Sequence, residues 1–172
     1  MRAHARKIRL LLLDIDGVLT DGGVVMDDRG DEIKRFHVRD GQGIRLLMEA
    51  GIEVAFITGR SSRVVEHRAK DLGVRRVYQN VKNKLDVYHE IKTAMALKDN
   101  EIAYVGDDIA DLPLMRRVGF PVTVQDGWKE LRRESRYVTR RRGGEGAIRE
   151  LAELLLKAQR KWKEVTQKYY QQ

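Results

Sequence analysis

Acidic and polar side chains follow three apolar runs of this 172-residue sequence, at the point where each run ends. The three groups are Asp14-Ile15-Asp16, Thr58-Gly59-Arg60 and Gly106-Asp107-Asp108. Carboxylates in such groups can attack an electrophile, transfer a proton or bind a hard metal ion. Gly17, directly after the first group, would let the chain turn sharply and present backbone N–H groups to an anion.

The elements that position these groups follow from the hydrophobic pattern. The runs Ile8–Leu13, Val54–Ile57 and Ile102–Val105 are nearly continuous, as is typical of parallel strands buried on both faces. Further short strands are predicted at Val77–Tyr78 and, at the sheet edge, at Pro121–Val124 and Tyr137–Val138. Helices are predicted at about 42–50, from Ser61 or Ser62 to Gly73, at about 85–97, and from about Asp111 to Gly119. This alternation predicts an α/β fold with a doubly wound, mainly parallel sheet, in a single domain over residues 1–172.

Two segments lie outside this alternation. The run Val24–Met26, the polar turn Asp27–Gly30 and a second apolar run predict a β-hairpin insertion within about residues 22–37. A long helix and tail are predicted over about 146–172, where apolar residues recur at intervals of three and four. They are Ile148, Leu151, Leu155, Ala158, Trp162, Val165 and Tyr169. We expect the first half of this seam to pack on the domain, and we hypothesise that the stretch beyond Trp162 contacts a neighbouring subunit.

The carboxyl ends of parallel strands face one crevice, so the three polar groups should meet there. Asp14, Asp16 and Asp107 would then form an anionic pocket, which is costly unless a cation occupies it. Magnesium prefers hard oxygen ligands and often binds one or two carboxylates together with a substrate phosphate. The pattern therefore predicts a site for Mg²⁺ and a phosphoryl group.

These residues resemble the four motifs of the haloacid dehalogenase superfamily. The segment Asp14–Gly22 resembles the first motif, Thr58-Gly59-Arg60 the second, Lys84 the third, and Gly106-Asp107-Asp108 with Asp111 the fourth. The resemblance implies a Rossmann-like fold with only the hairpin as an insertion and no large cap domain. It also implies a magnesium-dependent phosphomonoester hydrolase with an aspartyl-phosphate intermediate.

The resemblance implies a role for each motif residue. Asp14 attacks phosphorus, and Asp16 protonates the leaving oxygen and then deprotonates the hydrolytic water. Thr58 and Lys84 hold phosphate oxygens, although Lys82 is an alternative to Lys84. The expected metal ligands are Asp14, the backbone carbonyl of Asp16, and Asp107, and the residues expected to orient them from behind are Asp108 and Asp111.

A narrower resemblance is to the phosphatases of 3-deoxy-D-manno-octulosonate 8-phosphate in lipopolysaccharide synthesis. It rests on Phe36–Ile44, Ile57–Arg60, Tyr104–Asp108 and the segment 137–150. Such proteins are typically homotetramers whose hairpins meet and whose neighbours close each other's active sites. Glu145 departs from this pattern, because Gly-Gly-Glu-Gly resembles a related phosphatase for a nine-carbon keto-deoxy sugar 9-phosphate.

A phosphorylated sugar acid also carries a carboxylate, which needs cations beyond the phosphate site. Arginine suits a carboxylate through bidentate contacts. The residues expected to contact the substrate are Gly59, Arg60, Arg68 and Glu145.

The composition limits the kinds of substrate and binding partner that are expected for this protein. The net charge of +8 suits a small anionic substrate, and no nucleic-acid-binding motif surrounds the basic run Arg140–Arg142. No apolar run approaches the roughly 20 residues of a membrane span, so we expect a cytoplasmic protein without membrane contact. The absence of cysteine excludes a thiol nucleophile and disulfides. The alternative from another functional class is a non-catalytic assembly module of the same fold.

Overall fold

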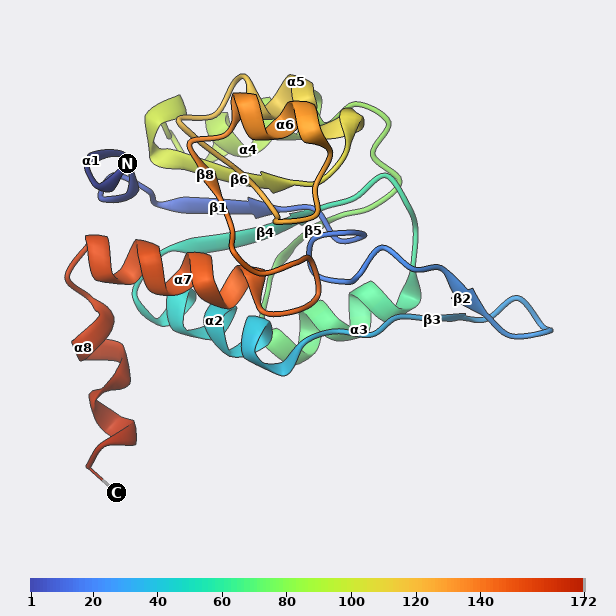
Figure 1. The fold of residues 1–172 in the computed structure, drawn as a ribbon, viewed down its shortest axis with the longest axis horizontal. Coiled ribbons are helices and arrows are strands. Elements are labelled where there is room, and N and C mark those ends of the chain that lie inside the picture. The colour runs from blue at the N-terminus through green and yellow to red at the C-terminus, as the bar shows by residue number, and fades with distance from the viewer. Residues whose placement is uncertain (172) are drawn as a thin grey trace.

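The structure is a computed structural model that describes residues 1–171, and its centre is a six-stranded parallel sheet (Figure 1). The strand order is β5-β4-β1-β6-β7-β8. The strands are β1 (Leu10–Leu13), β4 (Glu53–Ile57), β5 (Arg76–Tyr78), β6 (Ile102–Gly106), β7 (Phe120–Thr123) and β8 (Tyr137–Val138). The doubly wound, mainly parallel sheet is therefore confirmed. One detail of the prediction is wrong, because β7 lies inside the sheet, where the two-residue β8 covers its outer side.

Helices cover both faces of the sheet (Figure 1). On one face lie α2 (Val38–Glu49), α3 (Arg63–Leu72) and α7 (Ala147–Ala158), and on the other lie α4 (Lys84–Ala94), α5 (Leu112–Met115) and α6 (Lys129–Glu134). The alternating side chains of β1 enter two separate apolar clusters, Leu11 and Leu13 in one and Leu10 and Leu12 in the other. This double burial is why the run is apolar at every position. The remaining helical segments are α1 (Arg2–Ala5), η1 (Asp99–Glu101), η2 (Ile109–Asp111), α8 (Trp162–Thr166) and η3 (Gln167–Tyr169).

Helix α2 begins at Val38, four residues before the expected start. The imidazole of His37 caps it by accepting a hydrogen bond from the backbone N–H of Arg39. Gly43 sits where α2 crosses α7, and a Cβ there would lie 3.1 Å from the Cα of Arg149. The glycine, which lies inside the predicted helix, thus lets the two helices approach closely.

The expected long C-terminal helix is interrupted, so that prediction is wrong. Helix α7 ends at Ala158, and Arg160 adopts a left-handed φ of 61° before α8 begins. The break turns α8 toward α2, where Val165 becomes buried within the same chain. Lys168 also forms an ion pair with Glu49 at the end of α2. A contact of this region with a neighbouring subunit stays a prediction.

The predicted hairpin is present and projects from the body of the molecule (Figure 1). Its antiparallel strands are β2 (Val25–Met26) and β3 (Glu32–Ile33). Four apolar side chains of the hairpin are more than half exposed: Val24, Val25, Met26 and Ile33. No helix within residues 1–171 is long and apolar enough to cross a bilayer.

Candidate active site

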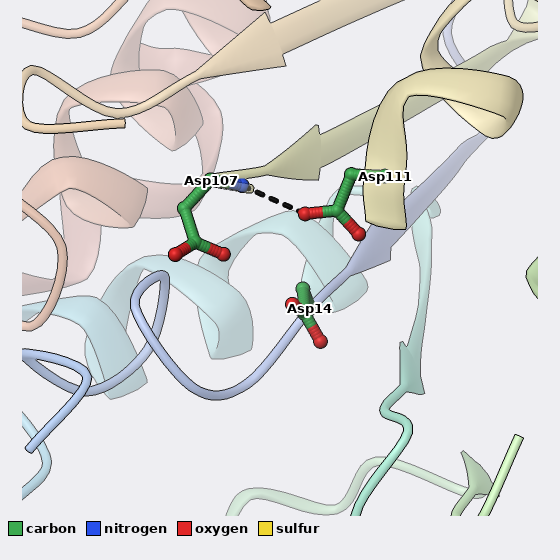
Figure 2. A group of neighbouring side chains, drawn as sticks. All are labelled: Asp14, Asp107 and Asp111. Carbon is green, nitrogen blue, oxygen red and sulfur yellow. Dashed lines mark hydrogen bonds between the residues drawn. The ribbon is translucent and has the colours of Figure 1, made fainter. Parts of the chain in front are cut away.

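The site lies at the carboxyl ends of β1 and β6, which are adjacent strands in register at Leu13 and Val105. Asp14 directly follows β1 and Asp107 directly follows β6, so their side chains meet at one edge of the sheet (Figure 2). Asp111, from η2, reaches the same place, and carboxylate oxygens of these three residues lie within 4.8 Å of one another. The convergence expected from parallel strand ends is thus realised by the fold.

Asp111 is the most fully bonded of the three carboxylates. One of its oxygens accepts hydrogen bonds from the backbone N–H groups of Asp107 (2.8 Å) and Asp108 (3.2 Å). The other accepts from Lys84 at 2.6 Å and from the hydroxyl of Tyr104. These four donors match the lone-pair sites of a carboxylate, so Asp111 has none left for a metal ion. Its place is therefore behind the ligands, where it fixes the start of the loop that carries Asp107.

Lys84 provides the cation of the site. It is the first residue of α4, which Asn83 caps by accepting from the N–H of Leu85, and its ammonium lies 3.0 Å from Asp14. Burial alone lowers the pKa of Lys84, but the carboxylates of Asp14 and Asp111 outweigh burial and raise it. The lysine therefore stays charged. The structure brings Lys84 to Asp14, while Lys82 is exposed.

Asp107 and Asp14 carry the unbalanced negative charge. Burial raises the pKa of Asp107 to about 8, with a further rise from its acidic neighbours, and burial raises the pKa of Asp14 to about 6 against the opposing effect of Lys84. Within residues 1–171, no backbone or side-chain group donates a hydrogen bond to the carboxylate of Asp107. A partly buried carboxylate with free oxygens beside a second carboxylate is a fitting site for a hard divalent cation. The residues present therefore fit Mg²⁺.

Gly17 shapes the wall of this pocket. It adopts a left-handed φ of 84°, and a Cβ at this position would lie 2.0 Å from a carboxylate oxygen of Asp107. The Gly143–Gly144 segment packs on the same loop, where the N–H of Gly144 donates to the carbonyl of Val18 at 3.0 Å. The glycines thus allow three loops to approach closely enough to bring Asp14 and Asp107 together.

Asp16 points to a different set of partners. It contacts the ammonium of Lys34 and, at 3.6 Å, the guanidinium of Arg60. Glu32 bridges the same two cations, at 3.0 Å from Lys34 and 2.8 Å from Arg60. The site predicted from the sequence motifs did not include Lys34 or Glu32. The signal that could have found them is their spacing of two, which puts both on one face of a strand while Ile33 takes the other.

Thr58 follows β4, the other neighbour of β1, and is buried. Its hydroxyl accepts from the N–H of Arg60 at 3.2 Å, which holds the turn at Gly59. The second motif therefore stands at the strand end beside Asp14. The fold places the three polar groups of the sequence at three adjacent strand ends.

The contacts that three other predicted residues make are with groups other than the carboxylate of Asp14. Arg68 pairs with Asp71 at 2.7 Å and lies over the ring of Phe36. Glu145 lines a separate cavity of about 530 Å³ with other charged side chains of α2 and α7. The exposed carboxylate of Asp108 accepts from the N–H of Ile109 and so starts η2. Their roles remain predictions.

A family model described as haloacid dehalogenase-like hydrolase matches residues 38–119. The chain belongs to this family of hydrolases, as its relatives and the architecture of the site both show.

More specifically, the chain is similar to proteins named 3-deoxy-D-manno-octulosonate 8-phosphate phosphatase. It is 48% identical over 159 residues to that of Escherichia coli K12, which covers 92% of this chain and 85% of the relative. It is 46% identical over 158 residues to that of Yersinia pestis, with 92% and 84% covered.

Solved structures agree with these relatives. The phosphatase from Moraxella catarrhalis, solved with a magnesium ion, a phosphate ion and KDO, matches with a TM-score of 0.95 and 38% identity. That match covers 98% of this chain and 97% of the other. The Yersinia pestis structure matches with a TM-score of 0.92 and 45% identity, and covers 93% and 86%.

Proposed function

We propose that this protein is a magnesium-dependent phosphatase that removes phosphate from 3-deoxy-D-manno-octulosonate 8-phosphate. The observation that carries the proposal is the placement of Asp14 beside a lysine and beside Asp107, a partly buried carboxylate with no hydrogen-bond donor among residues 1–171. The relatives named above act on this sugar acid according to their names, and one was solved with magnesium, phosphate and KDO. Their similarity over nearly the whole chain supports the substrate.

The geometry supports a division of roles. Asp14 attacks phosphorus, and the new bond from its oxygen forms as the bond to the sugar oxygen breaks. Asp16 gives a proton to that leaving oxygen and later takes one from water. Lys84 and Thr58 hold phosphate oxygens, because phosphoryl transfer depends on positioning and charge neutralisation.

The carboxylates of Asp14 and Asp107 and the backbone carbonyl of Asp16 would hold Mg²⁺. The ion, when bound, supplies positive charge that neutralises a phosphoryl oxygen. Asp111 fixes the loop that carries Asp107, and we assign Asp108 to the same supporting layer.

The test is phosphate release from the eight-carbon substrate and from a nine-carbon keto-deoxy sugar 9-phosphate, with and without magnesium. We expect magnesium-dependent turnover with preference for the eight-carbon ester. Asp14→Asn keeps the shape of the side chain, so it should abolish turnover while the circular dichroism spectrum stays unchanged. Turnover that survives chelation would contradict the metal site, and near-normal activity of Asp14→Asn would remove the nucleophile.

The nine-carbon sugar remains the second candidate because of Glu145, but the relatives reported above are named for the eight-carbon sugar. A non-catalytic assembly role is less favoured, because the side chains for catalysis are present and Asp14, Lys84 and Asp107 converge. Failure of every phosphosugar to turn over with magnesium would favour the assembly role.

We also propose a cytoplasmic homotetramer in which the exposed apolar hairpin, with Val25, Met26 and Ile33, packs against other copies. Arg60, Arg68 and Glu145 would then contact substrate, the last two from a neighbouring copy or a closing loop. Light scattering should report a mass of four chains. A monomer at micromolar concentration would contradict this assembly, and an unchanged mass after truncation beyond Lys161 would exclude the tail from it.

A further inference from the structure

A buried lysine at the base of the hairpin contacts Asp16 of the candidate active site. The ammonium of Lys34, just beyond β3, contacts a carboxylate oxygen of Asp16 and lies 3.0 Å from Glu32. The Lys34 side chain is only 2% exposed. Burying an ammonium is costly unless carboxylates compensate its charge, so this lysine is held in one place by its two acidic partners.

Arg60 contacts the same two acids in a different manner. Its side chain is 44% exposed, and its guanidinium lies 3.6 Å from Asp16, beyond hydrogen-bond distance. Its hydrogen bond is to Glu32, at 2.8 Å, rather than to Asp16. The buried lysine and the exposed arginine are therefore not equivalent, because only the lysine contacts Asp16 closely enough to hold its carboxyl group.

Glu32 completes the arrangement. Burial raises its pKa, but contacts with Ser62, Lys34 and Arg60 outweigh burial and lower the pKa to about 2. Glu32 is thus a permanent anion at neutral pH. It is the second carboxylate in contact with the ammonium of Lys34, so the lysine is held between two acidic partners.

We propose that Lys34 is a positioning residue for proton transfer, which holds the carboxyl group of Asp16 in line with the leaving oxygen of the substrate. The inference rests on the proposed function, in which Asp16 donates that proton as the bond from phosphorus to the sugar oxygen breaks. The contact of Lys34 is with Asp16, and no bond from Lys34 to the substrate is proposed. Lys34 acts through Asp16, and the hairpin is therefore part of the catalytic apparatus as well as a surface for assembly.

The test uses two esters whose leaving groups differ. A sugar alkoxide is a poor leaving group and needs the proton, whereas nitrophenolate leaves as a stable anion and needs none. The parameter kcat/KM reports the steps up to formation of the aspartyl phosphate, before Asp16 acts on water. Lys34→Met should lower kcat/KM for the phosphosugar on the order of 100-fold, as expected for a misplaced catalytic group. It should leave kcat/KM for p-nitrophenyl phosphate within about 3-fold of the unaltered chain, since the nucleophile and the groups that hold the phosphate are unchanged.

A double-mutant cycle tests the route through Asp16. Once Asp16→Asn has removed the proton donor, adding Lys34→Met should lower phosphosugar hydrolysis no further. Lys34→Arg should restore part of the activity because it returns a cation. Arg35→Met is the matched control, since Arg35 is the next residue but its exposed side chain pairs with Asp21. It should change neither ester. If Lys34→Met does not fold, Glu32→Gln loosens the same ammonium and should give a smaller change in the same direction.

An equal fall for both esters, or additive effects in the cycle, would overturn the inference, because Lys34 would then support the fold in general. No fall for either ester would overturn it as well. Failure of the proposed function looks different: the unaltered chain would hydrolyse p-nitrophenyl phosphate but neither phosphosugar. In that case the effect of Lys34→Met is compared between p-nitrophenyl phosphate and any alkyl phosphate that the chain hydrolyses. If the chain hydrolyses no ester at all, both proposals are overturned.

Discussion

Gly17→Ala should weaken metal binding far more than it weakens the fold. The new Cβ would lie 2.0 Å from a carboxylate oxygen of Asp107, so that oxygen must move by about 1.4 Å to reach ordinary contact distance. Magnesium demands nearly ideal ligand positions, and it tolerates no such shift of a ligand. We expect the dissociation constant for Mg²⁺ to rise about 10–100-fold, comparable to other losses of ligand support.

The substitution also strains the backbone, and a second glycine isolates that effect. Gly51 has a φ of 79°, but a Cβ there meets nothing within 4 Å. Gly51→Ala and Gly17→Ala should therefore each lose about 1–2 kcal/mol of unfolding free energy, from the left-handed conformation alone. Only Gly17→Ala should lose magnesium affinity. Titration calorimetry and urea unfolding measure the two quantities, and equal magnesium affinity in the two variants would refute the placement of Asp107 against Gly17.

In the metal-free protein the raised pKa values of Asp14 (about 6) and Asp107 (about 8) mean that stability is greatest below the unfolded value near 4 and falls as the pH rises through about 8. Added Mg²⁺ should therefore raise Tm more at pH 8 than at pH 5, and should release protons on binding at pH 7 in calorimetry; an equal rise at both pH values would contradict these shifts. Asp40, which is buried and accepts from the N–H groups of Gly146 and Arg149, ties α2 to the start of α7, so Asp40→Ala should cost about 2–3 kcal/mol in urea unfolding. The control Asp71→Ala removes the ion pairs of an exposed carboxylate with Arg45 and Arg68 and should cost about 1 kcal/mol or less. Equal costs would show that the Asp40 contact is no more than a surface one.

Local patterns in the sequence were sufficient to predict an element whose position or end is set by its own residues. The run Ile8–Leu13 is apolar throughout because β1 is covered on both faces, so its position inside the sheet could be predicted. Gly73 ends α3 in a left-handed conformation, as expected of a glycine after the last apolar turn. The prediction failed in the C-terminal region, where Arg160 breaks a seam that looks continuous and α8 turns to pack near α2.

The sequence by itself predicted which side chains meet, because Asp14, Thr58 and Asp107 each follow a run typical of a buried parallel strand, and the carboxyl ends of parallel strands face one edge of the sheet. Residue types alone could not rank the carboxylates, although the family resemblance placed Asp111 behind Asp107. The tertiary structure supplies the physical reason: four donors occupy the lone pairs of Asp111, whereas no group in the described part of the chain donates to Asp107.

Only the tertiary structure likewise brings Lys34 to Asp16, across 18 residues and a projecting hairpin. Pairing of this kind depends on where the hairpin folds back, and no local periodicity records that. The strand ends therefore follow from the sequence, and the partners that orient each carboxylate follow from the packing of loops and hairpin around them.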